Sequence, residues 1–318
     1  MSFLVVKSAE RVSNLHSEKS SVYISGKDFS SCKRSEYLNE KFNTANKIDN
    51  IQISYNVDNQ AIYNGSFSLY ANSSNVGSKL GKNPAVNLSS IDVGELWILL
   101  RLLSRKEISG IDFFYLVPDS YGGSDVGKNV VRNEVSISAG RWRGLPGLVT
   151  AWNIDDVDFR QFSFLGFDVH RLGSIDSYEG FPDNLKRTYI LADPPTAPYW
   201  LERSLRDNHE LIIEVLQDRL PETPIERMAG MCPATTNSQL HHIRAKAPSS
   251  QRWCLLPLGP KIQTLGAIVF TSNQLEIDNK NNNEPTVGML YDFPKPNKDM
   301  TVIQNPPKFY WKFRIEVI

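Results

Sequence analysis

The sequence predicts an α/β fold built from two Rossmann-like modules with mainly parallel sheets. Short apolar segments alternate with amphipathic helical segments in the order β-α-β-α-β, and both halves of the 318 residues show this alternation. Such alternation is typical of parallel strands covered by helices. An acidic stretch at residues 153–158 separates the halves. We therefore expect an N-terminal Rossmann-like module over residues 1–157 and a C-terminal Rossmann-like module over residues 158–318.

The N-terminal half has short and rather polar elements. Residues 1–20 are polar after a brief apolar start, which predicts a loosely attached segment. Strands are expected at residues 21–25, 49–55, 66–70, 111–117, 130–137 and 145–152. Helices are expected at residues 30–42, and at residues 93–105 with Asp92 as the N-cap.

The C-terminal half has a more regular pattern. Strands are expected at residues 161–167, 188–192, 226–231, 253–258, 286–291 and 309–317. Helices are expected at residues 169–179, at 198–216 as the longest, at 235–246, and from Ile262 onwards.

The composition excludes several classes of protein. Lys and Arg number 35 and Asp and Glu number 35, so no net charge favours bulk binding to nucleic acid or membranes. The three cysteines, Cys32, Cys232 and Cys254, form no CxxC pair, which argues against structural disulfides and a zinc site. We expect no metal and no cofactor. The apolar runs are shorter than the ~20 residues of a membrane span, and no signal peptide is visible. Both observations predict a cytoplasmic protein.

The strongest candidate site is the segment Gly259-Pro260-Lys261, between a buried strand and a helix. Parallel sheets bind ligands at such corners, because the N–H groups and the positive end of the helix point outward there. Gly259 would allow a ligand to approach the backbone, and Lys261 would add a positive charge. Gln263 and Thr264 follow in the first turn. The plain alternative is a turn with a solvated lysine.

Other polar residues end strands at the same expected edge. They are Gly26 and Lys27 after the first strand, Asp168 after residues 161–167, Asp193 after residues 188–192, and Asp292. Asp168 and Asp193 have a commoner role as N-caps of the helices that follow them.

A glycine-rich stretch at residues 122–129 matches the spacing GxxxxGK of a phosphate-binding loop. Asn129 stands where Ser or Thr would hold magnesium, and the residues after it read as extended rather than helical. We therefore interpret this stretch as a flexible loop that holds no nucleotide.

The histidines and Cys254 give no catalytic pattern. His241 and His242 sit on a helix without a partner at metal-ligand spacing, and His170 stands alone beside Asp168. Cys254 falls in a buried strand, where a thiol is inert.

The strand ending in Gly259-Pro260-Lys261, the helix with Leu265-Gly266-Ala267 and the strand near residues 287–293 resemble the sensor domains called CARF (CRISPR-associated Rossmann fold) and SAVED. The resemblance covers mainly residues 160–293. Those domains often carry a Gly-Thr/Ser-Lys loop here, so Pro260 departs from the family pattern. SAVED domains look like two fused CARF modules, which suits the two halves.

The resemblance implies that Gly259, Pro260, Lys261 and Gln263 contact a cyclic oligonucleotide messenger of antiviral signalling. We recognise no nuclease, protease, NADase or membrane helix in the sequence, so the resemblance also implies that the effector is a separate protein.

Two functions from different classes remain open at this point. The first is a nucleotide-sensing or scaffold subunit without catalysis. The second is a nucleotide- or nucleoside-processing hydrolase with Asp168, Asp193 or Asp292 as general base, for which no single motif is present. A purely structural interaction protein is a third alternative.

Overall fold

The computed structural model describes residues 2–15, 20–27, 33–45, 48–117, 120–121, 136–137, 142–148, 158–167, 169–175, 185–217, 225–293, 295–296, 301–302 and 310–318. The chain forms two compact units. The middle unit is Ser138–Pro294, and the terminal unit joins Ser2–Ile137 with Lys295–Ile318. The sequence predicted a single boundary, between residues 157 and 158. The observed division differs because the last strand, residues 310–317, belongs to the same unit as the N-terminal half.

The terminal unit has a mixed eight-stranded sheet in the order β1-β18-β7-β6-β2-β3-β4-β5. Its strands are β1 (Leu4–Val12), β18 (Tyr310–Val317), β7 (Gly110–Tyr115), β6 (Ala85–Asn87), β2 (Val22–Gly26), β3 (Asp49–Asn56), β4 (Ala61–Tyr63) and β5 (Ser68–Leu69). β7, β6, β2 and β3 pair in parallel, and the strands on either side of them are antiparallel. The expected parallel pairing is therefore found in the middle of this sheet but not at its edges.

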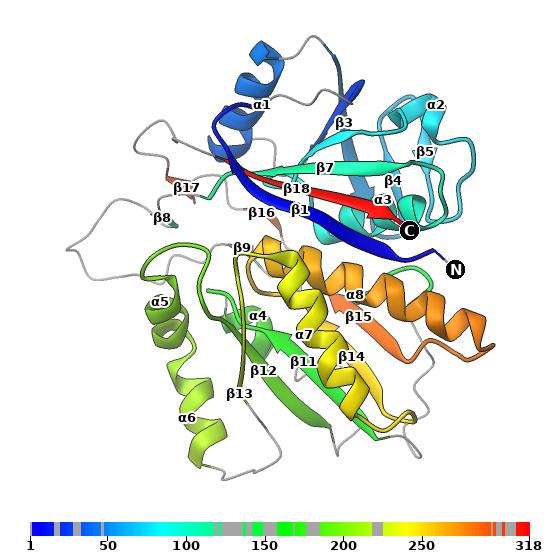
Figure 1. Ribbon diagram of the computed structural model, residues 1–318. Helices are drawn as coiled ribbons and strands as arrows, with labels where there is room; N and C mark the ends of the chain where they lie inside the picture. Colours follow the sequence, from blue (N-terminus) through cyan, green and yellow to red (C-terminus); the bar gives the residue numbers. More distant parts are fainter. Residues whose placement is uncertain are drawn as a thin grey trace. The chain divides into compact units, whose positions relative to one another are not determined.

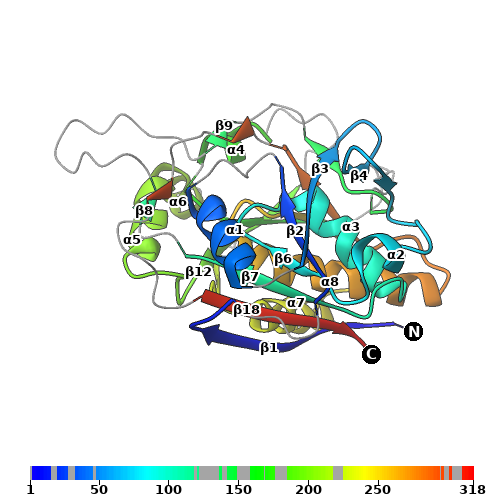
Figure 2. The same ribbon diagram turned by 90° about the horizontal axis from the view of Figure 1, so that it is seen from above.

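The sequence suggested that the N-terminal segment is loosely attached, but this prediction is wrong for the strand β1. β1 pairs along its length with β18, and the N–H and C=O groups of Phe3 and Ile318 bond to each other. Figure 2 shows β1 and β18 side by side, with the labelled ends of the chain close together. Leu4 is buried, whereas the following residues of β1 are exposed or partly exposed, as is typical of an edge strand.

In its described residues, the terminal unit has three helices: α1 (Lys33–Ala45), α2 (Gly77–Leu80) and α3 (Val93–Ser104). Leu38 and Phe42 of α1 pack in one cluster with Tyr23, Phe114 and Tyr310 of the sheet. Asp92 caps α3, as predicted, and Glu95 completes a capping box. Two further ladders of two residues each pair β8 (Ser120–Tyr121) with β17 (Thr301–Val302), and β9 (Ser136–Ile137) with β16 (Lys295–Pro296).

The middle unit has a six-stranded sheet in the order β10-β15-β14-β11-β12-β13. Figure 1 labels the strands from β11 to β15. The strands are β10 (Arg143–Gly144), β15 (Val287–Tyr291), β14 (Arg252–Leu256), β11 (Phe159–Phe164), β12 (Lys186–Ala192) and β13 (Ile225–Met228). All neighbours pair in parallel except β10 with β15. Residues 145–148 form a turn after β10 instead of the expected strand.

The described helices between these strands are α4 (Val169–Gly173), α5 (Trp200–Asp207), α6 (His209–Gln217), α7 (Pro233–Lys246) and α8 (Lys261–Lys280). The single long helix expected at residues 198–216 is two helices. The amide Nδ2 of Asn208 donates to the carbonyls of Gly166 (2.9 Å) and Ser204 (2.7 Å), and Asn208 is the C-cap of α5. α8, with 20 residues, is the longest helix of the described chain.

Close packing fixes α8 on the sheet. The Trp253 ring of β14 lies 4.4 Å from Phe162 of β11 and 5.9 Å from Phe270 of α8, centroid to centroid. Gly266 lets α7 and α8 approach each other, since a Cβ there would stand 2.5 Å from the carbonyl oxygen of Pro233. Among the described helices, none is both long enough and apolar enough to cross a membrane.

Candidate ligand-binding site

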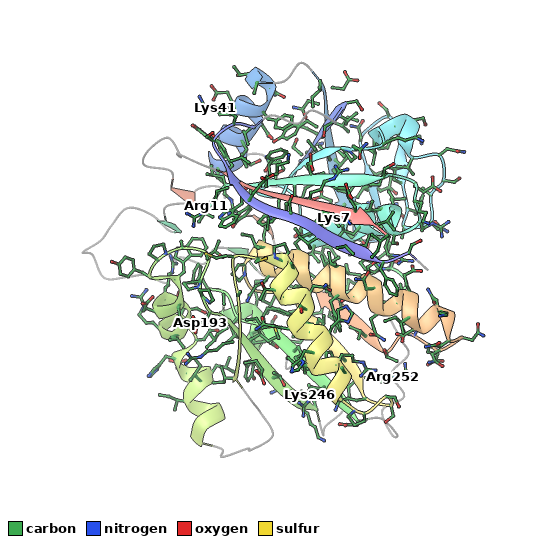
Figure 3. The ribbon with its side chains drawn as sticks, viewed as in Figure 1. Lys7, Arg11, Lys41, Asp193, Lys246 and Arg252 are labelled. Carbon is green, nitrogen blue, oxygen red and sulfur yellow. The ribbon has the colours of Figure 1, made fainter. Side chains whose placement is uncertain are left out.

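The carboxyl ends of the five parallel strands of the middle unit lie side by side, and we call this side of the sheet its carboxyl edge. Asp193 follows β12 at this edge, and Arg252 begins β14 at the opposite edge (Figure 3). The strand order reverses between β11 and β14, because the chain passes from β11 to β12 on one side and later returns to β14 on the other. Open α/β sheets bind ligands outside the carboxyl ends of strands at such a reversal. The corner at residues 259–264 (the 259–264 corner) follows β14 at this position.

The local structure of the 259–264 corner is close to the prediction. β14 ends at Leu256, and α8 begins at Lys261, one residue before the expected start. Pro260 is the N-cap (φ −57°, ψ 141°), and its carbonyl accepts from the N–H of Thr264 at 3.0 Å. The proline ring carries no acceptor, so the N-cap side chain cannot bind the first N–H groups of α8. Gly259, Pro260 and Lys261 are partly exposed.

Gln263 and Thr264 are buried. Gln263 Nε2 donates to the carbonyl oxygen of Met228 at 2.8 Å, while Oε1 accepts no hydrogen bond from any described residue. The opposite orientation of the amide would place two oxygens together, so this one is the favourable choice. Oε1 lies 3.1 Å from the position that a Cβ on Gly259 would take. The 259–264 corner therefore contains a buried acceptor on the side of Gly259.

Two glycines bring the loops after β11 and β14 into backbone contact. A Cβ on Gly166 would stand 2.3 Å from the carbonyl oxygen of Leu258 and 3.6 Å from Cα of Gly259. The Gly166 carbonyl in turn accepts from Ser204 Oγ (3.3 Å) and Asn208 Nδ2 (2.9 Å). α5 and the residue after it are thereby attached to the 259–264 corner. In the sequence, Gly166 falls near the end of the strand expected at residues 161–167, with no signal for this contact.

The carboxylates considered as general bases are held by arginines. Asp292 is fully buried and accepts from Arg171 Nε at 2.9 Å (Oδ1) and 3.1 Å (Oδ2), with a further bond from Nη2 to Oδ1. Asp193 pairs with Arg227 at 3.2 Å and its side chain is 27% exposed. The role of general base proposed for Asp292 does not agree with this burial. Asp168 lies outside the described residues.

Sequence reasoning missed Arg171, which also lies over the Tyr291 ring at 4.9 Å. A buried aspartate at the end of a strand requires a cationic partner or a hydrogen-bond donor. This requirement is the signal by which Arg171 could have been found. His170 precedes Arg171 in α4.

Gly26 and Lys27 lie in the terminal unit and have different surroundings. The N–H of Gly26 donates to Ser90 Oγ at 2.9 Å, and a Cβ on Gly26 would stand 2.1 Å from the Ser90 carbonyl oxygen. Gly26 is therefore required for packing. Lys27 is exposed. Asp92 and Glu95 already place two carboxylates at the nearby N-terminus of α3, which disfavours an anionic ligand there.

Buried polar side chains near β6 form a network that the sequence did not reveal. Asn87 Nδ2 donates to Asn39 Oδ1 (2.9 Å) and Ser35 Oγ (3.3 Å), and its Oδ1 accepts from the N–H of Ser89 (3.0 Å). Tyr23 Oη also donates to Asn39 Oδ1 at 2.9 Å. These bonds satisfy the Asn87 amide, so the network holds α1 against the sheet.

The remaining candidates give no site in the described part of the chain. The stretch at residues 122–129 lies outside it. Within it, no three His, Cys, Asp or Glu side chains gather as metal ligands. Cys232 and Cys254 are free thiols, and burial raises the pKa of Cys254, in keeping with the predicted inert thiol.

Comparison of the chain with protein-family models, with curated proteins and with solved structures finds no match.

Proposed function

We propose that the chain is a nucleotide-sensing or scaffold subunit of a bacterial antiviral defence system, and that a phosphorylated ligand binds at the 259–264 corner. The observation that carries the proposal is the position of α8. Its N-terminus follows β14 at the reversal of strand order, beside a buried Gln263 Oε1 that accepts no bond from the described residues. An anion is stabilised by the helix end, and Gln263 offers an acceptor to a hydroxyl or amino group of the same ligand.

Two Rossmann-like modules are part of this proposal. In the middle unit the parallel strands have the order β13-β12-β11-β14-β15, which corresponds to 3-2-1-4-5 in the doubly wound fold. In the terminal unit the parallel strands have the order β3-β2-β6-β7, which corresponds to 2-1-3-4 of the flavodoxin-like fold. The sensor domains that the sequence resembles are built on such sheets.

A hydrolase acting on a nucleotide or nucleoside has less support. Asp292 is buried against Arg171, and Asp193 is paired with Arg227. A general base must reach its substrate by hydrogen-bond distance, directly or through one water molecule. A sensor needs no such group. The proposal also includes a cytoplasmic location and a separate effector protein as the partner, as predicted from the sequence.

Calorimetric titration of the purified chain with cyclic di-, tri- and tetranucleotides tests the proposal. We expect saturable binding of at least one of them, and no hydrolysis of the bound nucleotide when the mixture is analysed by chromatography. Hydrolysis that disappears on Asp193→Asn would favour the hydrolase instead. Absence of binding for the whole panel would contradict the proposed ligand.

A further inference from the structure

Aromatic residues surround the 259–264 corner along the carboxyl edge of the middle unit's sheet. Phe293 follows β15, Phe167 follows β11, and Tyr199 lies between β12 and α5. In the order β15-β14-β11-β12, seen in Figure 1, the corner stands between Phe293 on one side and Phe167 and Tyr199 on the other. Neighbouring strands lie ~4.8 Å apart, so the loops with Phe293 and Tyr199 start about 5 and 10 Å from β14.

Tyr199 has an unusual backbone and an exposed ring. Its φ of 65° and ψ of 1° are left-handed, and the residue is 80% exposed. The next residue, Trp200, is instead buried and packs edge-on against Phe167 at 5.5 Å. A left-handed conformation is costly for a bulky side chain, and such residues gather at functional sites. The fold thus maintains an unfavourable conformation that leaves the tyrosine ring in solvent.

Phe293 has the same kind of backbone on the other side of the 259–264 corner. Its φ is 46°, and its partly exposed ring stands 5.2 Å from Tyr291 at 87°. In the described residues of the middle unit, the non-glycine residues with positive φ are Tyr199, Asn282 and Phe293. Asn282 lies in the turn after α8, where asparagine is common. The other two residues with positive φ, Tyr199 and Phe293, are aromatic, and both follow strands at the carboxyl edge of the sheet.

Cationic groups accompany these rings. Arg203, which pairs with Asp207 at 3.2 Å, lies 4.5 Å over Phe167. Arg171 lies 4.9 Å over Tyr291 but is buried and bonded to Asp292, whereas Arg203 and Lys261 are partly exposed. Lys261 belongs to the 259–264 corner itself. Aromatic rings beside cations are the features by which proteins hold unpaired nucleotides, because bases stack on the rings and phosphates bind the cations.

We infer that Tyr199 and Phe293 are stacking surfaces for two nucleobases, on either side of a phosphodiester bound at the 259–264 corner. The ligand class is then a dinucleotide unit, linear or within a ring, rather than a mononucleotide or a base-free anion. This inference rests on the proposed function, since it assumes that a phosphate occupies the corner. It adds where the bases bind and how many of them the site accepts.

Four probes separate these ligand classes in calorimetric titrations: cyclic diadenylate, linear diadenylate, adenosine 5′-monophosphate and ribose 5-phosphate. The variants are Tyr199→Asn, Tyr199→Phe, Phe293→Leu and Lys261→Ala. Asparagine tolerates the left-handed backbone, so Tyr199→Asn removes the ring without disturbing the loop. Tyr70→Ala, which removes a partly exposed ring (44%) from the terminal unit, is the matched control.

We expect a diadenylate to bind at least ten-fold more tightly than the monophosphate. Each base that stacks contributes enough for its loss to weaken binding roughly five- to a hundred-fold. Tyr199→Asn and Phe293→Leu should each show such a loss for the diadenylates, whereas Tyr199→Phe and Tyr70→Ala should bind as the unchanged protein does.

The outcomes also separate the inference from the proposed function. Lys261-dependent binding of a diadenylate that Tyr199→Asn and Phe293→Leu leave unchanged would overturn the inference and preserve the proposed function. Equal affinity for the monophosphate and the diadenylates would have the same meaning. If Lys261→Ala changes nothing, both are overturned. If no probe binds, the inference is overturned, and binding of the cyclic tri- and tetranucleotides decides the proposed function.

Discussion

The guanidinium of Arg171 donates hydrogen bonds to both carboxylate oxygens of Asp292, and both side chains are buried. The pair joins α4 to the end of β15, two elements that are far apart in the sequence. Burial of two opposite charges is tolerated because each satisfies the other, so removal of one partner leaves an uncompensated charge in the core.

Asp292→Leu should therefore destabilise the protein by about 3–5 kcal/mol. The double variant Arg171→Met with Asp292→Leu should recover most of that loss, because no unpaired charge remains. Urea unfolding of the single and double variants measures both values. Glu284→Leu removes one partner of the more exposed pair with Arg252 and should cost no more than ~1 kcal/mol. A double variant as unstable as Asp292→Leu would show that the geometry of the ion pair itself is needed.

Gly166→Ala should destabilise the middle unit by roughly 1–3 kcal/mol, a typical cost of overpacking. The new Cβ would meet the carbonyl oxygen of Leu258 at 2.3 Å, so the backbone must move. Gly173→Ala is the control, since a Cβ there has no atom within 4 Å. Thermal unfolding of both variants gives the comparison. Equal melting temperatures would mean that the loops after β11 and β14 are further apart in solution.

Lys261→Ala should weaken binding of the phosphorylated ligand roughly ten- to a hundred-fold, the loss expected for one charge-assisted contact worth ~1.5–3 kcal/mol. Lys280→Ala, at the exposed C-terminal end of the same helix, should bind normally. Both should keep the melting temperature, since Lys261 is only partly buried. Full ligand affinity in Lys261→Ala would end the hypothesis of a site at this helix N-terminus.

The stability of the protein should fall in acid partly because of His241. Burial lowers the pKa of this histidine from its usual 6.5, and its ring lies 4.8 Å from that of Phe270. A folded-state pKa below the unfolded one means that the unfolded chain binds more protons. This contribution is complete above about pH 6.5 and is lost as the pH falls from there through the folded-state pKa.

His241→Gln should therefore show a smaller loss of stability than the unchanged protein between pH 7.5 and pH 5. His242→Gln is the control, because the neighbouring His242 is exposed. Urea midpoints measured at several pH values give the slopes. If the slope of His241→Gln equals that of the unchanged protein, another group is responsible for the acid sensitivity.

Local signals in the sequence predicted most of the middle unit and the position of the candidate site. The strand before Gly259 and the helix after Pro260 were predicted within two residues, because apolar runs and a Gly-Pro pair act locally. The cap at Asp92 was predicted for the same reason. The role of Gln263 in the site was expected, but its bond to Met228 required the fold.

Long-range pairings could not be predicted in this way. Nothing in residues 1–20 indicates that β1 pairs with a strand some 300 residues later, because a polar edge strand looks like a loop. The break at Asn208 depends on the Gly166 carbonyl, which is contributed by another part of the chain. The partnership of Arg171 with Asp292 likewise arises only when α4 meets β15.

The return of β18 to the terminal unit sets an order for folding during synthesis. Among the described strands, β1 has β18 as its only neighbour in the sheet, so β1 has no partner during synthesis until residues 310–317 have emerged. The middle unit is continuous in sequence and has all of its strands once residue 291 is made. Units fold as they emerge, so the unit that contains the 259–264 corner can be complete while the terminal unit still lacks β18.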